Sequence, residues 1–161
     1  MAYVKLANFI EVYRLRSDGA EDVEWRYQNS SPGERLTFRG ESDWQYLSFV
    51  YQGAARNRTG DNLEPALVLS VNQISQDIAR KAVMRRLHVR VYSVVTESSY
   101  KPIDKTLSIE EWLAATMTYD AETLEVILSS GIDAVGANAP TRVLSKSLVG
   151  RLPVTASINA G

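Results

Sequence analysis

Cysteine is absent from this 161-residue sequence, and histidine occurs only once, as His88. Without cysteine the chain can form no disulfide, no Cys-ligated iron–sulfur cluster or zinc site, and no thiol nucleophile. A single histidine also excludes metal sites built from two or three histidines of one chain. Only carboxylate-rich sites for hard cations remain open. We therefore expect no bound metal and no organic cofactor.

The sequence also has no long hydrophobic run and no excess of charge of one sign. Its longest apolar stretches are far shorter than the roughly 20 residues that span a bilayer, so we expect no membrane span. Residues 1–10 lack the basic and apolar regions of a signal peptide. The chain has 18 Lys and Arg against 19 Asp and Glu, so we expect no stable binding to nucleic acid or to an anionic membrane.

Motifs for catalysis are missing as well. No Gly-x-Ser-x-Gly turn accompanies His88, which lies in an alternating segment among arginines. Glu110 and Glu111 are adjacent, so on a strand they point to opposite faces and cannot converge on one bond. No phosphate-binding Gly-Lys-Ser/Thr pattern follows the glycines near residues 53–60. We therefore expect that the protein is not an enzyme.

Alternation of apolar and polar residues dominates the chain and predicts short β-strands. The predicted strands cover residues 8–16, 23–28, 36–39, 46–51, 66–72 and 88–96, with a surface loop over 52–65. The period changes once, where Ile74, Ile78 and Ala82 form a stripe with a spacing of four. This stripe predicts a helix near 74–86 that packs through those three residues and is capped by Asn72 or Ser75.

Two structures are open for residues 109–129. The segment Ser108-Ile-Glu-Glu111 has the pattern of a capping box, which indicates a helix over 109–115. The alternation from Leu113 to Tyr119, followed by a second alternating segment at 123–129, instead indicates a hairpin that turns across residues 120–122. We prefer the hairpin.

These elements predict a mainly β fold: a partly open β-barrel or small sandwich with one inserted α-helix and an extended C-terminal arm. We expect one β domain over residues 1–130. Residues 131–161 are small and polar, with few large apolar side chains. We expect this arm to dock on a neighbouring chain.

Charge is segregated along the sequence. A basic cluster contains Arg80, Lys81, Arg85, Arg86, His88 and Arg90, whereas residues 104–125 contain six acidic residues (Asp104, Glu110, Glu111, Asp120, Glu122 and Glu125) and one lysine. Opposite patches suit head-to-tail contacts in a ring, and they equally suit ion pairs within one chain or a solvated surface. The candidate inter-subunit contacts are Arg80, Lys81, Arg85, Arg86, Glu110, Glu111 and Glu122.

The order of several motifs resembles a known family. The motifs are Phe38-Arg-Gly40, Tyr46-Leu-Ser-Phe49, the run from Glu64 to Ile74 and the late run from Ala115 to Leu124. Within the run from Glu64, a proline, an alternating Leu/Val strand, an asparagine and an isoleucine precede the helix; these are Pro65, Leu67, Leu69, Val71, Asn72 and Ile74. The arrangement over residues 8–130 resembles the hub domain of phage tail-tip proteins. It is similar to the minor tail protein L family of lambda-like siphophages and to a related family found in phage tail operons.

This resemblance implies a structural subunit of a bacteriophage tail tip or baseplate hub. Copies would form a homo-oligomer, a trimer or a larger ring, between the distal tail ring and the central fibre or spike, with the tape measure as another partner. The protein would lie in the virion tail, and in the host cytoplasm during assembly. The cysteine-rich iron–sulfur part of that family cannot be carried over, because this chain has no cysteine. The alternatives are a nucleic-acid-binding β-barrel that uses the basic cluster at 80–90 and a small hydrolase.

Overall fold

The structure is a computed structural model that describes residues 5–53, 55–56, 62–96 and 102–130. Within these ranges it contains eleven strands and one helix. The first six strands are β1 (Lys5–Leu15), β2 (Glu21–Gln28), β3 (Leu36–Phe38), β4 (Glu41–Tyr46), β5 (Phe49–Gln52) and β6 (Ala55–Arg56). They are followed by β7 (Asn62–Leu63), β8 (Ala66–Ser70), α1 (Gln73–Met84), β9 (His88–Thr96), β10 (Pro102–Tyr119) and β11 (Thr123–Ser129).

Nine of the strands form one sheet in the order β3-β4-β2-β1-β9-β10-β11-β8-β5, and β6 pairs with β7. All neighbours in the large sheet are antiparallel except β2 and β4. The prediction of a mainly β fold with one inserted helix is confirmed. The sheet is not closed into a barrel.

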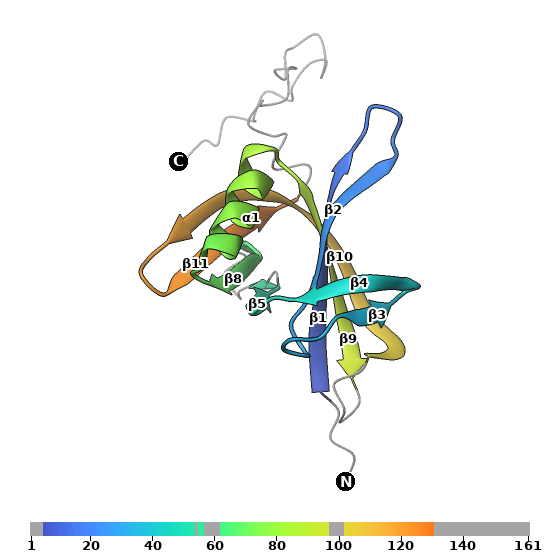
Figure 1. Ribbon diagram of the computed structural model, residues 1–161. Coiled ribbons are helices and arrows are strands. Elements are labelled where there is room, and N and C mark those ends of the chain that lie inside the picture. The colour runs from blue at the N-terminus through green and yellow to red at the C-terminus, as the bar shows by residue number, and fades with distance from the viewer. Residues whose placement is uncertain (1–4, 54, 57–61, 97–101, 131–161) are drawn as a thin grey trace, which may run out of the picture.

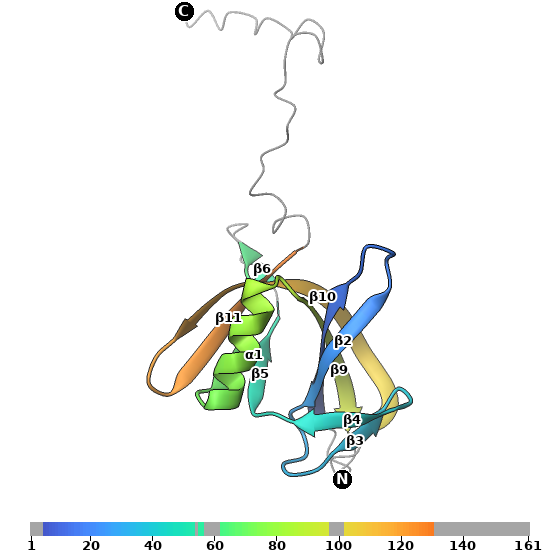
Figure 2. The same cartoon turned by 45° about the horizontal axis from the view of Figure 1, so that its top comes forward.

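The sheet is strongly curled. Two strands near opposite ends of the strand order are joined by a short connection, so the two ends of the sheet must lie close together. β4 and β5 lie near opposite ends of the order, yet only Leu47 and Ser48 separate them. The backbone N–H of Leu47 donates to the carbonyl of Gln28 in β2 at 2.9 Å, and the side chain of Asn29 donates to the carbonyl of Phe49 at 3.1 Å. The two ends of the sheet therefore meet at this point, and α1 lies across the remaining opening between β2 and β11 (Figure 1, Figure 2).

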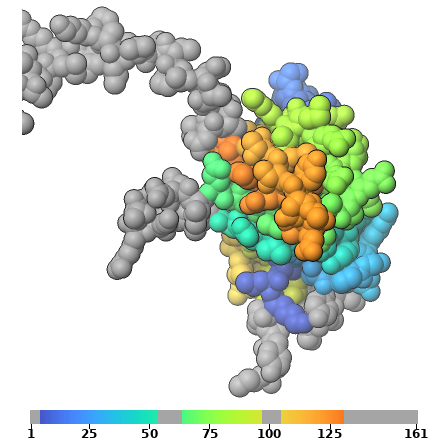
Figure 3. Space-filling view, turned by 90° about the vertical axis from the view of Figure 1, so that its left-hand side faces the viewer, coloured from blue at the N-terminus to red at the C-terminus, as the bar shows by residue number. Residues whose placement is uncertain are grey.

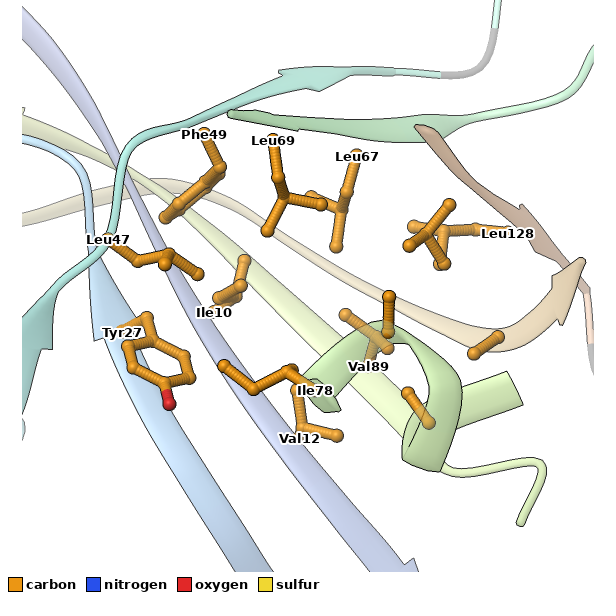
Figure 4. Packing of buried hydrophobic residues seen from close by; sticks show 14 of the residues in the cluster. Ile10, Val12, Tyr27, Leu47, Phe49, Leu67, Leu69, Ile78, Val89 and Leu128 are labelled. Carbon is orange, nitrogen blue, oxygen red and sulfur yellow. The ribbon is translucent and has the colours of Figure 1, made fainter. Parts of the chain in front are cut away.

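Helix α1 fills the inside of the curl. Its residues Ile78, Ala79 and Ala82 are buried and pack against apolar side chains of the strands, among them Val12 and Val89 (Figure 4). The complete inner core contains Ile10, Val12, Tyr27, Leu47, Phe49, Leu67, Leu69, Ile78, Ala79, Ala82, Leu87, Val89, Val91, Ala114, Leu124, Val126 and Leu128. The inner face of the sheet and α1 thus share this core.

Both ends of α1 are fixed by local hydrogen bonds. Asn72 is the N-cap: its side chain accepts from the N–H of Ser75 at 2.8 Å, and the Ser75 hydroxyl accepts from the N–H of Asn72 at 3.0 Å. At the other end the N–H of Leu87 donates to Ala82 and that of Arg86 donates to the carbonyl of Val83, which is a Schellman motif. Of the two cap candidates from the sequence, Asn72 is the N-cap and Ser75 is the N3 residue that bonds back to it.

The prediction that Ile74 packs into the core is wrong. Its side chain is 65% exposed, and Ser75 occupies the buried position instead. At about 100° per residue, Ile74 lies roughly 90° from the middle of the arc formed by the buried residues 75, 78, 79 and 82. A spacing of four drifts around the helix, so the first residue of the stripe leaves the contact surface.

A second core lies on the opposite, outer face of β1 and β9. Phe38 and Trp44 of the β3–β4 hairpin pack against Phe9 and Tyr92, with ring centroids 4.4–6.0 Å apart. The indole N–H of Trp44 donates to the carbonyl of Phe38 at 3.0 Å, so the buried ring has a polar partner. Both faces of β1 and β9 are therefore covered in this part of the sheet.

Other predictions had mixed outcomes. The hairpin is confirmed by β10 and β11, and the helix over 109–115 is wrong because Ser108–Leu113 pairs with β9. The predicted strand 46–51 is in fact the last residue of β4 and most of β5, with a break between them that the alternation did not indicate. The predicted loop 52–65 contains the strand pair β6–β7. Residues 131–161, the expected arm, lie outside the described residues.

The contrast between Ile78 and Ile74 supplies a test of the core. We expect Ile78→Ala to lower the free energy of unfolding by about 2–4 kcal/mol, because it leaves a cavity under α1. Ile74→Ala, the same change on the same helix, should shift it by no more than about 0.5 kcal/mol. Urea denaturation followed by circular dichroism measures both. Equal effects of the two substitutions would contradict this placement of α1.

Candidate inter-subunit surfaces

A row of alternating charges crosses the outer face of the sheet. The register places Arg26 of β2, Glu11 of β1, Arg90 of β9 and Glu111 of β10 side by side. Arg26 donates to one oxygen of Glu11 at 2.8 Å and Arg90 donates to the other at 2.9 Å. Arg90 also donates to Glu111 at 2.7 Å and to Glu21 at 2.6 Å. Glu11 is only 7% exposed. A buried carboxylate needs partners of opposite charge, and Arg26 and Arg90 on the neighbouring strands supply them.

Arg90 and His88 are thereby separated from the rest of the basic cluster. The guanidinium of Arg90 lies 4.7 Å from the ring centroid of Tyr13, and His88 stacks on the same ring at 5.1 Å. Burial lowers the pKa of His88 and raises the pKa of Tyr13. The hydrogen bond with Glu21 raises the pKa of Arg90. These two residues belong to the face of the sheet and are not part of a basic surface on α1.

Glu110 and Glu111 point to opposite faces, as expected for a strand, and both have partners in their own chain. The hydroxyl of Tyr51 donates to Glu110, and the indole N–H of Trp112 donates to the Tyr51 oxygen at 2.9 Å. Burial and the bond to Glu110 raise the pKa of Tyr51. This contact ties β5, at the end of the sheet, to β10. For Glu110 and Glu111 the structure thus supports the alternative of interactions within one chain.

The remaining basic residues gather at the C-terminal end of α1. Lys81 pairs with Asp77 at 2.8 Å, one turn earlier, and Arg85 pairs with Glu24 of β2 at 3.3 Å. Arg80 and Arg86 are exposed, and neither makes an ion pair among the described residues. We call Arg80, Arg85 and Arg86 the basic surface.

Arg86 has an unusual backbone conformation. Its φ is 48°, at the position of the Schellman motif where glycine is favoured because it has no side-chain clash in the left-handed region. The next residue, Leu87, is completely buried and anchors the end of the helix. A long cationic side chain therefore occupies a position that local backbone energetics alone would assign to glycine.

Acidic residues gather at the turn between β10 and β11. Asp120 accepts from the N–H groups of Glu122 and Thr123, both at 2.8 Å, and these bonds lower the pKa of Asp120. Glu122 is exposed and Glu125 partly so, and within the described ranges none of the three carboxylates makes an ion pair. We call Asp120, Glu122 and Glu125 the acidic tip. The side chain of Asp104 lies outside the described residues.

The basic surface and the acidic tip lie at opposite ends of α1. The carbonyl of Glu122 accepts from the N–H of Val71, directly before the N-cap Asn72, so the tip is beside the start of the helix. Of the basic surface, Arg80 lies about 12 Å along the helix, and Arg85 and Arg86 follow its last residue, about 18 Å away. Figure 3 shows the β10–β11 hairpin (orange) next to α1 (green) on one side of the molecule.

A groove of about 670 Å³ separates α1 from β2. It is lined by Trp25 and Tyr27 of β2 and by Gln73, Ile74, Gln76, Asp77, Ile78 and Arg80 of α1. From Glu21 to Arg26, β2 pairs on one side only, with β1, because β4 joins it at Tyr27 and Gln28. Sequence patterns did not indicate this groove, since it is formed by two elements that meet only in the folded chain.

Within the described ranges, no group of three or more His, Asp or Glu side chains is placed to hold a metal ion. Helix α1, the one helix described, is too short and too polar to cross a membrane. The sequence matches no protein-family model and has no significant match among curated proteins.

The buried Glu11 makes Arg90 important for stability. We expect Arg90→Gln to lower the free energy of unfolding by about 3 kcal/mol, because it leaves a largely buried carboxylate with one cation in place of two. Arg14→Gln breaks only the exposed pair with Asp22, so we expect a change of no more than about 1 kcal/mol. Urea denaturation at neutral pH measures both. A loss no larger than that of Arg14→Gln would show that Arg90 does not support the sheet.

Glu21 gives the stability a dependence on pH. Hydrogen bonding to Arg90 lowers the pKa of Glu21, so its ionised form stabilises the fold above the unfolded-state pKa, and this stabilisation is lost as the pH falls through the lower folded-state pKa. Between about pH 5 and pH 3, we expect the free energy of unfolding to fall more steeply for the unmodified protein than for Glu21→Gln. Glu41→Gln, at an exposed residue 3.7 Å from its cation, is the control and should follow the unmodified protein. Parallel curves for all three proteins would contradict the role of Glu21.

Proposed function

We propose that this protein is a structural subunit of a bacteriophage tail tip or baseplate hub and forms a homotrimer or a larger ring. The observation that carries the proposal is the run from Glu64 to Met84. Here Pro65 precedes the alternating strand β8, Asn72 caps the helix, and α1 follows directly. This is the order on which the resemblance to tail-tip hub domains rests, and it lies within a mainly β fold of the expected class.

The charge distribution supports contacts between two different surfaces of neighbouring subunits. The basic surface and the acidic tip carry opposite signs and lie at opposite ends of one helix, so neither surface is complementary to itself. Contacts between different surfaces of identical subunits generate rings when the rotation closes. Exposed ion pairs contribute only about 0–1 kcal/mol each, so these charges would select the orientation of neighbours while apolar contacts supply most of the affinity.

The proposal also covers the other partners. We place the ring between the distal tail ring and the central fibre or spike, near the tape measure, in the virion tail and, during assembly, in the host cytoplasm. Residues 131–161 carry three basic residues and one acidic residue, whereas residues 1–130 carry 15 and 18. These opposite net charges favour a contact of the C-terminal segment with the body of this domain, and we propose that the body belongs to a neighbouring chain.

Charge reversal on the basic surface tests the ring. We expect Arg80→Glu with Arg86→Glu to weaken self-association, with a larger effect at low salt, where charges are least screened. Arg14→Glu with Arg16→Glu makes the same change in net charge at the β1–β2 turn and should have little effect. Light scattering coupled to size-exclusion chromatography, at two salt concentrations, measures the mass of the assembly. A monomeric unmodified protein at every concentration would refute the proposal.

A substitution at Arg86 distinguishes its effect on assembly from its effect on stability. We expect Arg86→Gly to raise the free energy of unfolding by up to about 1 kcal/mol, because glycine adopts the left-handed conformation without strain. The same change removes a cation from the basic surface and should weaken association. Denaturation and light scattering on one variant would then move in opposite directions. If association were unchanged, Arg86 would have no place in the interface.

The basic cluster at 80–90 also suggested a nucleic-acid-binding barrel. Arg90 is held by three carboxylates of its own chain and His88 stacks on Tyr13, so the described structure leaves fewer free cations than the sequence indicated. Salt-dependent retention of DNA in an electrophoretic shift, abolished by Arg80→Glu with Arg86→Glu, would favour this alternative. We expect no retention at physiological salt.

A further inference from the structure

We infer that the turn of the β10–β11 hairpin of one subunit binds in the groove between α1 and β2 of the next subunit. The inference rests on the proposed ring and names the two surfaces that meet in it. Each surface has exposed apolar side chains together with charges of one sign that have no ion-pair partner among the described residues.

The groove is lined by both apolar and polar side chains, and Arg80 is among the latter. Trp25, Tyr27 and Ile78 form its apolar lining, and the 65% exposed Ile74 stands at its edge. The carboxylate of Asp77 is paired with Lys81, so Arg80 is the one lining charge without an ion pair among the described residues. An occupant of the groove should therefore combine a large apolar side chain with a negative charge.

The hairpin turn has both properties. Tyr119 is 66% exposed at the end of β10 and stands immediately before the acidic tip. The turn is held in shape by the bonds that Asp120 accepts from Glu122 and Thr123. A rigid turn loses little conformational entropy on binding. An aromatic ring against Trp25 and Tyr27 would contribute beyond the area that it buries.

Charge complementarity points to a second copy of the chain as the occupant. The tip lies beside Val71, before the start of α1, whereas Arg80 of the groove lies in the second half of the same helix. The charges of Arg80 and the tip are complementary between neighbours oriented head to tail. Such a contact joins different residues of the two partners, and when it is repeated with a rotation that closes it builds a ring.

The absence of cysteine makes a direct test possible, because an introduced thiol is the only one in the chain. Gln76→Cys places a thiol in the groove, and Thr118→Cys places one beside Tyr119, without changing the residues proposed to bind. The two single variants are purified separately, mixed, and treated with a short bismaleimide. We expect a covalent dimer that contains one chain of each kind, identified by mass spectrometry. Val50→Cys, an exposed position on β5, replaces Gln76→Cys in the control mixture and should give at least fivefold less product.

A charge exchange provides the second measurement. We expect Arg80→Glu alone and Glu122→Arg alone each to raise the concentration needed for association about tenfold, and the double variant to restore most of the loss. Oligomers without the Gln76–Thr118 product, or without rescue, would overturn this inference and leave the proposed ring intact. A protein that is monomeric at all concentrations would overturn both.

Discussion

Packing of Ile78, Ala79 and Ala82 of α1 into the curled sheet is the contact on which the rest of the structure depends. Leu47 bonds to Gln28 and Asn29 bonds to Phe49 where the two ends of the sheet meet, but without α1 much of the inner apolar face would be open to water. The helix closes this opening. Because the Asn72 cap and the Schellman motif fix its two ends, the helix also sets the distance between the acidic tip and the basic surface.

The outer face is organised by a different interaction. Glu11 is buried in the middle of β1 and is bonded to Arg26 on one side and to Arg90 on the other. A buried carboxylate in this position requires both partners, so the two arginines stabilise the fold and are not available for contacts with other chains. Glu111 and Glu21 are drawn into the same network through Arg90. Of the basic cluster, Arg80 and Arg86 keep no ion-pair partner among the described residues, and the same holds for the carboxylates of the acidic tip.

In a ring built from this domain, weak ion pairs would select the orientation of neighbouring subunits, and exposed apolar side chains would supply most of the affinity. The exposed apolar side chains Ile74 and Tyr119 flank the groove and the acidic tip respectively. Neither side chain contributes to the described cores, and each lies next to charges that lack an ion pair among the described residues. This pairing of an exposed apolar group with an unpaired charge distinguishes the two surfaces from Glu110 and Glu111, whose partners lie in the same chain.

The sequence by itself determined the local elements, because their signals lie within a few residues of one another. Alternation located most strands, the Asn72–Ser75 pair located the start of α1, and the segment around Asp120 specified the hairpin turn. Only the tertiary structure decided which charges are free. Arg90 and Glu11 are 79 residues apart, and strand register alone brings them into contact. The groove between α1 and β2 and the exposure of Ile74 likewise depend on how the helix sits in the curled sheet, which no local pattern encodes.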